Sequence, residues 1–276
     1  MASVPVIHES EREYHAKAKH YLSSHQLADF RKCPALLHRK RSGLIPDVES
    51  NAYLIGRAAH CLILEGRTEF DGRYLIGGGP INERTGKPFG PQTKAFAEWR
   101  VNEPRDVLSD VQGADVVRMA DAVAAHAAAS ALLSAGEAEA VVRTEYCGVP
   151  SQIRIDWWRA AGLVDGTAAD GPRIVDLKTC DDIDWFESDA RRFGYLHQMA
   201  FYAGVIEAVG HVFPDVSIIA VEKKEPYRCG VWDVGRASLQ LARRENEAAI
   251  REFRECEQAG VWPTRYEKVR VLEVAA

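Results

Sequence analysis

The sequence lacks several features that would assign it to a specialised class of protein. Among its 276 residues, no uninterrupted apolar run approaches the ~18 residues that a membrane-spanning helix needs. The first twenty residues contain no apolar core of the signal-peptide type. The six cysteines are scattered, and no two have the C-x-x-C spacing of a zinc site or an iron–sulfur cluster. We therefore expect a cytoplasmic protein with no membrane partner and no Fe–S cluster.

The sequence also lacks an excess of basic charge. Lys and Arg together number 35 and Asp and Glu 40, so the formal net charge is 35 − 40 = −5. If this chain binds DNA, local patches or bound cations must overcome the overall repulsion. The apolar content of 46% excludes a mainly disordered chain. We expect a flexible tail over residues 1–20 and a single domain over residues 21–276.

The order of the expected elements is typical of an α/β or α+β fold, in which a central mixed sheet is flanked by helices. Residues 21–135 are expected to be mainly helical, residues 139–235 to form the sheet core, and residues 236–276 to form a C-terminal helix and tail. A capping box at Ser23-x-x-Gln26 starts a helix that Pro34 kinks or splits. The Gly- and Pro-rich residues 71–91 are expected to form a long loop.

Asp176 and Lys178 lie two residues apart in an expected strand over 173–179, so their side chains share one face. A carboxylate and an ammonium placed in this way could be a metal ligand and a group that activates water, or equally a surface ion pair. The other such tripeptide, Glu222-Lys223-Lys224, also ends an apolar run. We interpret it as charges that close a strand at the solvent edge.

The strand expected over 150–158 places Asp156 on the same face as Gln152 and Arg154, with Ile153, Ile155 and Trp157 on the other face. The turn-rich residues 162–171 would let this strand pair with the next one as a hairpin. Because neighbouring strands lie ~4.8 Å apart, Asp156 and Asp176 could share one Mg²⁺ or Mn²⁺ ion. The alternative for Asp156 is a solvated carboxylate at a strand end.

Two further patterns favour a site. Gln198 and Tyr202 have the i, i+4 spacing of one helix face. His60 is an isolated histidine in the apolar helix expected over 51–65, where the alternative is a core histidine.

Taken in this order, His60, Asp156, Asp176-Leu-Lys178 and Gln198-x-x-x-Tyr202 resemble the PD-(D/E)XK nuclease superfamily, in its RecB-like and phage exonuclease branch. The pattern is most similar to exodeoxyribonuclease VIII-like proteins of phages and prophages. Ile155 stands where the superfamily's name has proline. The further matches span residues 22–266 and comprise Leu22-Ser-Ser24, Cys33-Pro34, Gly56-Arg57-Ala-Ala-His60, Arg84-Thr-Gly-Lys87, Tyr195-x-x-Gln198, Val221-Glu222-Lys-Lys-Glu-Pro-Tyr227 and Trp262-Pro-x-x-Tyr266.

The resemblance implies a fold with a restriction-endonuclease-like core and a role for each residue. Asp156, Asp176, the Leu177 carbonyl and a neutral His60 would hold one or two Mg²⁺ or Mn²⁺ ions. Glu145 is a weaker candidate ligand, since it could equally be a surface glutamate. Lys178 would orient or deprotonate the attacking water. Gln198 and Tyr202 would hold the substrate or support the site.

Several basic or polar residues are candidates for contact with DNA phosphates. The window from Arg31 to Arg41 is the most basic in the chain and could follow a DNA backbone, or could be a solvated helix face. The candidates are Ser24, Arg31, Arg57, Arg154, Arg191 and Arg192.

The resemblance implies a metal-dependent exonuclease that digests duplex DNA ends from 5′ to 3′ and leaves 3′ single-stranded tails for phage-type recombination. It also implies a ring-shaped homo-oligomer and a single-strand annealing recombinase as partner. The alternatives are an endonuclease or flap-type repair nuclease with the same metal site, and a DNA-binding module that has lost catalysis.

Overall fold

The computed structural model describes residues 4–46, 51–90, 92–164 and 167–272. Its helical elements are α1 (Glu11–Ala16), α2 (Ser24–Lys32), α3 (Pro34–Arg41), α4 (Asn51–His60), η1 (Cys61–Glu65), α5 (Arg67–Arg73), α6 (Lys94–Asn102), α7 (Asp110–Ala125), α8 (Ala127–Leu132), η2 (Ile183–Trp185), α9 (Phe186–Arg192), α10 (Tyr195–Gly210) and α11 (Arg236–Ala259). Its strands are β1 (Tyr74–Ile76), β2 (Ile81–Asn82), β3 (Lys87–Pro88), β4 (Asp106–Leu108), β5 (Glu137–Tyr146), β6 (Val149–Arg159), β7 (Gly162–Val164), β8 (Thr167–Asp170), β9 (Arg173–Cys180), β10 (Asp215–Glu222) and β11 (Cys229–Asp233).

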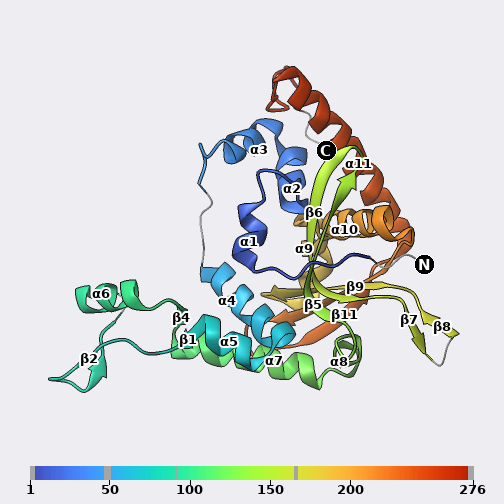
Figure 1. The fold of residues 1–276 in the computed structure, drawn as a ribbon. Helices are drawn as coiled ribbons and strands as arrows, with labels where there is room; N and C mark the ends of the chain where they lie inside the picture. The colour runs from blue at the N-terminus through green and yellow to red at the C-terminus, as the bar shows by residue number, and fades with distance from the viewer. Residues whose placement is uncertain (1–3, 47–50, 91, 165–166, 273–276) are drawn as a thin grey trace.

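The central sheet has five strands in the order β11-β10-β9-β6-β5. Strands β9 and β10 are parallel because α9 and α10 carry the chain back between them, whereas the other neighbours are antiparallel. Helices cover both faces of this mixed sheet (Figure 1). The predicted α/β architecture, with a central mixed sheet and a helical N-terminal part, is therefore confirmed.

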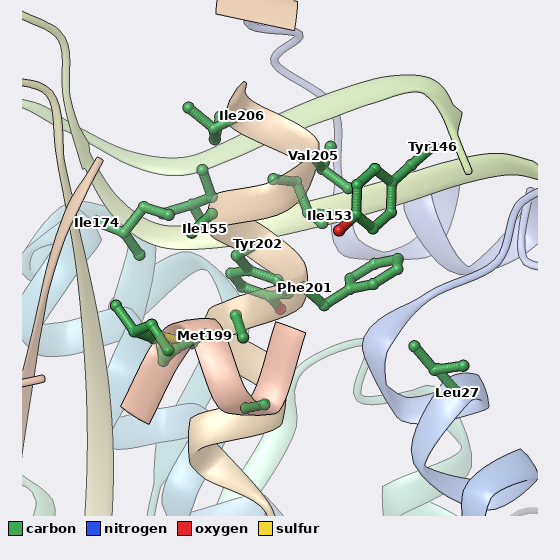
Figure 2. Close-up of a cluster of buried hydrophobic side chains, with 14 of the residues drawn as sticks. Leu27, Tyr146, Ile153, Ile155, Ile174, Met199, Phe201, Tyr202, Val205 and Ile206 are labelled. Atoms are coloured by element: carbon green, nitrogen blue, oxygen red, sulfur yellow. The ribbon is translucent and has the colours of Figure 1, made fainter. Parts of the chain in front are cut away.

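Each face of the sheet has its own apolar core, and the side chains of β9 contribute to both because they point alternately to the two faces. Ile174 of β9 packs in a cluster with α10, α2 and α11, part of which is drawn in Figure 2. Val175 and Leu177 pack on the opposite face, against α4 and α7. Helix α10 is apolar on nearly all sides and largely buried, as expected for a helix enclosed between the sheet and α11.

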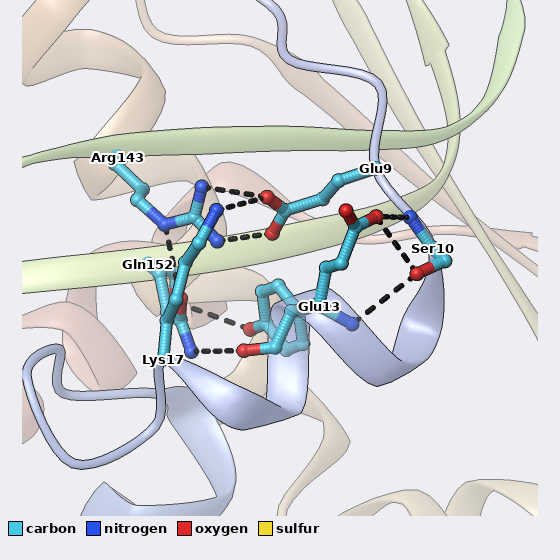
Figure 3. A network of polar contacts seen from close by, with 7 residues as sticks. Glu9, Ser10, Glu13, Lys17, Arg143 and Gln152 are labelled. Carbon is cyan, nitrogen blue, oxygen red and sulfur yellow. Dashed lines mark hydrogen bonds and ion pairs between the residues drawn. The ribbon is translucent and has the colours of Figure 1, made fainter.

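The segment predicted as a flexible tail is held against the sheet over residues 4–20. Ile7 forms a β-bridge with Val141, and a capping box at Ser10 starts α1. Arg143 pairs with Glu9 through both terminal guanidinium nitrogens, and Gln152 donates to the Tyr14 carbonyl at 3.4 Å (Figure 3). Tyr14 is buried. This prediction was wrong because the partners of the segment lie more than 130 residues away in the sequence.

The N-terminal half also differs from the prediction in detail. The capping box at Ser23 and Gln26 is confirmed, and Pro34 separates α2 from α3. The expected long loop over 71–91 instead contains the end of α5 and three short strands. The β2–β3 hairpin and α6 project away from the sheet (Figure 1). Within the described residues, no helix is long and apolar enough to cross a membrane.

Candidate functional site

The candidate site lies where β6 and β9 separate. Their antiparallel pairing begins at Arg159 opposite Arg173 and ends at Trp157 opposite Val175. One step further in the same register, Asp156 lies opposite Asp176. There the Asp156 carboxylate accepts a hydrogen bond from the Leu177 backbone N–H at 2.8 Å. The split between the strands thus places both predicted acidic residues side by side.

Asp176 is the more buried of the two aspartates. It is 1% exposed, and its Oδ2 lies 2.6 Å from the Nζ of Lys178. Its Oδ1 is buried without a hydrogen-bond partner in the part of the chain that the structure describes. Burial, together with the neighbouring Asp156, raises the pKa of Asp176 to about 6, although Lys178 acts to lower it. A buried, under-satisfied carboxylate is costly for folding and is typical of a binding site.

Lys178 keeps its proton despite its burial. Desolvation alone would lower the pKa of its ammonium, but Asp176 and Asp156 outweigh that effect and raise it. The Lys178 side chain is therefore a charged ammonium beside the two carboxylates.

Helix α4 lies on the face of the sheet that α7 also covers, and it brings His60 to the site. The helix packs against β9, with Gly56 beside Thr179. The Nδ1 of His60 lies 3.5 Å from Asp156 Oδ2, and the imidazole also forms a hydrogen bond with the Leu177 backbone. Burial and the charge of Lys178 lower the pKa of His60 to about 4. The imidazole is thus neutral near pH 7, as a metal ligand must be.

Helix α10 lies on the opposite face of the sheet from α4, and one side of this helix faces the site. Tyr195, Gln198 and Tyr202 are spaced three and four residues apart along this helix. Gln198 donates to the Tyr202 hydroxyl at 3.2 Å, and Lys178 Nζ lies 5.0 Å from the centroid of the Tyr195 ring. Tyr202 is 5% exposed, and its hydroxyl is close enough to the site for Asp156 and Asp176 to act on it electrostatically.

Sequence reasoning missed a third acidic residue, Glu139. Ala138 pairs with Trp157 and Ala140 with Ile155, so Glu139 lies opposite Asp156. Its φ of 57° is unusual for a residue other than glycine and marks a local irregularity of β5. Burial and the charge of Asp156 raise the pKa of Glu139 to about 8, and Arg154 Nε lies 2.6 Å from Glu139 Oε2.

Glu139, Asp156 and Asp176 therefore form a row across three adjacent strands. The structure does not bring Glu145 to this row. Glu145 is exposed near the hairpin turn, opposite Pro150, six residues or roughly 20 Å along β5 from Glu139. The expected alternation of β6 also breaks after Ile155, because Trp157 packs in the opposite cluster from Ile153 and Ile155.

The candidate phosphate contacts lie in different environments. Arg31 donates to Asn246 at 2.7 Å, which joins α2 to α11, and Ser24 is buried. Arg57 approaches Asp106 at 3.3 Å. The side chains of Arg191 and Arg192 are exposed on α9. Arg154 lies beside the acidic row, because it pairs with Glu139 and acts electrostatically on Asp156. Arg57 lies one turn before His60 on α4.

The sequence predicts that Glu222 lies at the solvent edge of a strand, and this prediction is wrong. It is 1% exposed and accepts hydrogen bonds from the Ile183 and Arg228 backbones, at 3.0 and 3.2 Å. The Arg228 guanidinium pairs with both of its oxygens. These contacts, Arg228 first, lower the pKa of Glu222 to about 2.

The donor set of the row fits a hard divalent cation, although the side chains would have to rearrange. Within the described ranges, no three His, Cys, Asp or Glu side chains already have the arrangement of a metal site. Lys178 occupies Asp176 Oδ2 and the Leu177 N–H occupies Asp156 Oδ2. The buried Asp176 Oδ1 remains as an oxygen donor without a hydrogen-bond partner among the described residues.

Comparisons with known proteins agree with this architecture. Residues 23–274 match the family described as a "PDDEXK-like domain of unknown function (DUF3799)". The crystal structure of a protein called "Putative exonuclease", from Eubacterium rectale, has a similar fold, with a TM-score of 0.65 and 15% sequence identity. The match covers 98% of this chain and 97% of that chain. A search of curated proteins found no match. Since the family match covers most of its length, this chain belongs to the PDDEXK-like family DUF3799.

Proposed function

We propose that the protein is a metal-dependent deoxyribonuclease that digests duplex DNA ends from 5′ to 3′. The observation that carries the proposal is the split between β6 and β9, where Asp156, Asp176, Lys178 and His60 meet. Paired acidic residues with a protonated lysine are suited to phosphodiester hydrolysis, which needs charge stabilisation on the phosphate and a positioned water.

Each residue has a role that follows from its environment. Asp156 and Asp176, with the Leu177 carbonyl and neutral His60, would hold one or two Mg²⁺ or Mn²⁺ ions. A bound ion would polarise a phosphate oxygen and lower the pKa of water. The Lys178 ammonium would face the scissile phosphate and offset its charge. Gln198 and Tyr202 would keep the α10 side of the site in place.

The approach of DNA to a chain of net charge −5 needs local positive charge. Arg154 is the best placed of the candidates, because it pairs with Glu139 of the acidic row. Arg57 is a second candidate, since it lies one turn before His60 on α4. Arg191 and Arg192 could contact a more distant phosphate.

The experiment uses linear duplex DNA labelled separately at its 5′ and 3′ ends, beside a closed circular duplex, each with Mg²⁺ and with EDTA. We expect release of the 5′ label from linear DNA only, and its loss in EDTA. Cutting of the circle would replace the proposal with an endonuclease. DNA binding without cleavage in Mg²⁺ or Mn²⁺ would replace it with a non-catalytic module.

The proposal extends to assembly and partners. A ring around DNA would keep an acidic protein on its substrate through many cleavage cycles, and a single-strand annealing recombinase would take up the 3′ tails. Analytical ultracentrifugation of the purified chain tests the ring. A monomer at micromolar concentration, with or without DNA, would contradict it.

A further inference from the structure

Besides the charge of Asp156, two groups close to the Lys178 ammonium attract it. On one side it pairs with Asp176 Oδ2 at 2.6 Å, and on the other it lies 5.0 Å from the centroid of the Tyr195 ring. A distance below about 6 Å is within the range of a cation–π interaction. The Lys178 side chain is 16% exposed, so little water competes for the charge.

The position of Tyr195 is fixed by its surroundings. It is the first residue of α10, directly after Gly194, whose φ of 74° turns the chain into the helix. Its ring lies 6.1 Å from that of Phe186, which is buried, and 6.0 Å from that of Phe193. The ring is therefore held by a rigid helix start and an aromatic neighbour in the core.

The attraction of the Tyr195 ring matters most when the nearby carboxylates bind another cation. If Asp176 and Asp156 bind a divalent cation, their charge is shared with that cation and attracts Lys178 less strongly. The ammonium is then repelled by the cation and, without another attraction, would turn toward solvent. The Tyr195 ring supplies an attraction that no metal ion competes for.

We propose that Tyr195 is a positioning residue that holds the Lys178 ammonium beside the scissile phosphate by a cation–π interaction. This inference rests on the proposed nuclease function and adds to it a residue that acts through Lys178. The competing explanation is that Tyr195 only fills space between α9 and α10.

Ring electronics separate the two explanations. Tyr195→Phe retains the ring and should cleave at a rate within about twofold of wild type. Tyr195→Leu removes it and should slow single-turnover cleavage about tenfold at saturating Mg²⁺, with little change in the affinity for DNA. Phenylalanines carrying one to five fluorine atoms at position 195 keep the shape but weaken the negative ring face, so the rate should fall step by step.

Tyr266 supplies a matched control, because Arg270 lies 4.2 Å from the centroid of its exposed ring. The same fluorinated residues at position 266 should leave the rate unchanged. A second readout needs no turnover: in protein with ¹³C-labelled lysine, the Lys178 ε-methylene signal should be shifted upfield by the ring. The signal is assigned by its absence in Lys178→Arg, and the shift should persist in Tyr195→Phe and vanish in Tyr195→Leu.

Equal rates across the fluorinated series in an active enzyme would overturn the positioning role and leave the nuclease function intact. A Phe variant as slow as the Leu variant would overturn it too, because the hydroxyl would then be the acting group. Absence of cleavage by the wild-type protein would instead overturn the proposed function, and the positioning role with it.

Discussion

Two tripeptides of the same pattern lie on neighbouring parallel strands, and the pKa values of their carboxyl groups are shifted in opposite directions. Asp176-Leu-Lys178 lies in β9, and Glu222-Lys-Lys224 begins at the last residue of β10. Both carboxylates are 1% exposed. The pKa of Asp176 is raised to about 6 by burial and Asp156, whereas that of Glu222 is lowered to about 2, first by Arg228.

The difference separates the carboxylate of the candidate site from one with a structural role. Glu222 is fully satisfied by two backbone N–H groups and a guanidinium, and so it ties the start of η2 to the turn that precedes β11. Asp176 shares one ammonium and retains an oxygen without a hydrogen-bond partner in the described part of the chain. Burial is therefore common to both, and hydrogen-bond satisfaction distinguishes them.

The strongest test of this comparison is Asp176→Asn. We expect Mg²⁺-dependent cleavage to fall by about 10³-fold or more, equivalent to about 4 kcal/mol of transition-state stabilisation. The free energy of unfolding should change by only about 1–2 kcal/mol, because loss of the Lys178 partner opposes relief of the buried charge. Single-turnover cleavage and urea unfolding, measured on the same preparation, check both expectations. Cleavage within tenfold of wild type would remove Asp176 from the proposed metal centre.

Glu222→Gln should show the reverse behaviour. Loss of the charge that Arg228 and the two N–H groups bind should lower the free energy of unfolding by about 2–3 kcal/mol. Cleavage at a temperature where the variant is folded should stay within about twofold of wild type. Glu225→Gln, at the exposed neighbouring acidic residue, is the matched control. A folded but inactive Glu222→Gln would mean that the wrong tripeptide had been assigned to the site.

The stability difference between wild type and Glu222→Gln should also depend on pH. The pKa of Glu222 is about 2 in the folded chain and 4.5 without the contacts of the fold. The ionised form of Glu222 therefore stabilises the fold fully above pH 4.5. That contribution is lost as the pH falls through 2, where wild-type Glu222 takes up a proton. Urea unfolding at several pH values should show the two proteins converging, and a constant gap would contradict the assignment to Glu222.

Glu139→Gln sharpens the comparison by asking whether the acidic row extends to β5. The substitution replaces a carboxyl beside Asp156 with an amide that cannot ionise, and it removes the carboxyl partner of Arg154. We expect single-turnover cleavage to slow by about three- to tenfold, an intermediate effect, while Glu145→Gln on the same strand stays at the wild-type rate. Equal rates for the two variants would restrict the site to β6 and β9.

The position of Glu139 could have been predicted from the sequence. The tight turn at Cys147 and Gly148 places Tyr146 opposite Val149, and counting back along both strands puts Glu139 opposite Asp156. Choosing Glu145 from its strand alone, without this count, led to the wrong end of the hairpin. The alternation of β9, in contrast, placed Asp176 and Lys178 on one face without any knowledge of partners.

Other features depend on contacts that local patterns do not contain. The pairing of Glu9 with Arg143 and of Ile7 with Val141 joins segments that are far apart in the sequence. The burial of Glu222 likewise depends on Arg228 and on the backbone of η2, so an acidic residue at a strand end looks solvated until its tertiary partners are known. Motif order and strand alternation thus point to the candidate site, whereas the pKa shifts of its residues follow from packing.

The smallest expected effect is at the last residue of the second tripeptide. Lys224 is exposed in the turn after β10, whereas Lys178 is held between a carboxylate and an aromatic ring. Lys224→Met should therefore change the free energy of unfolding by less than about 0.5 kcal/mol and cleavage by less than twofold. Lys178→Met, measured in parallel, should lose most of its cleavage because the charge opposite the phosphate is gone. Equal loss of cleavage in the two lysine variants would contradict this comparison. The sequence pattern of the tripeptides, and not their environment, would then determine function.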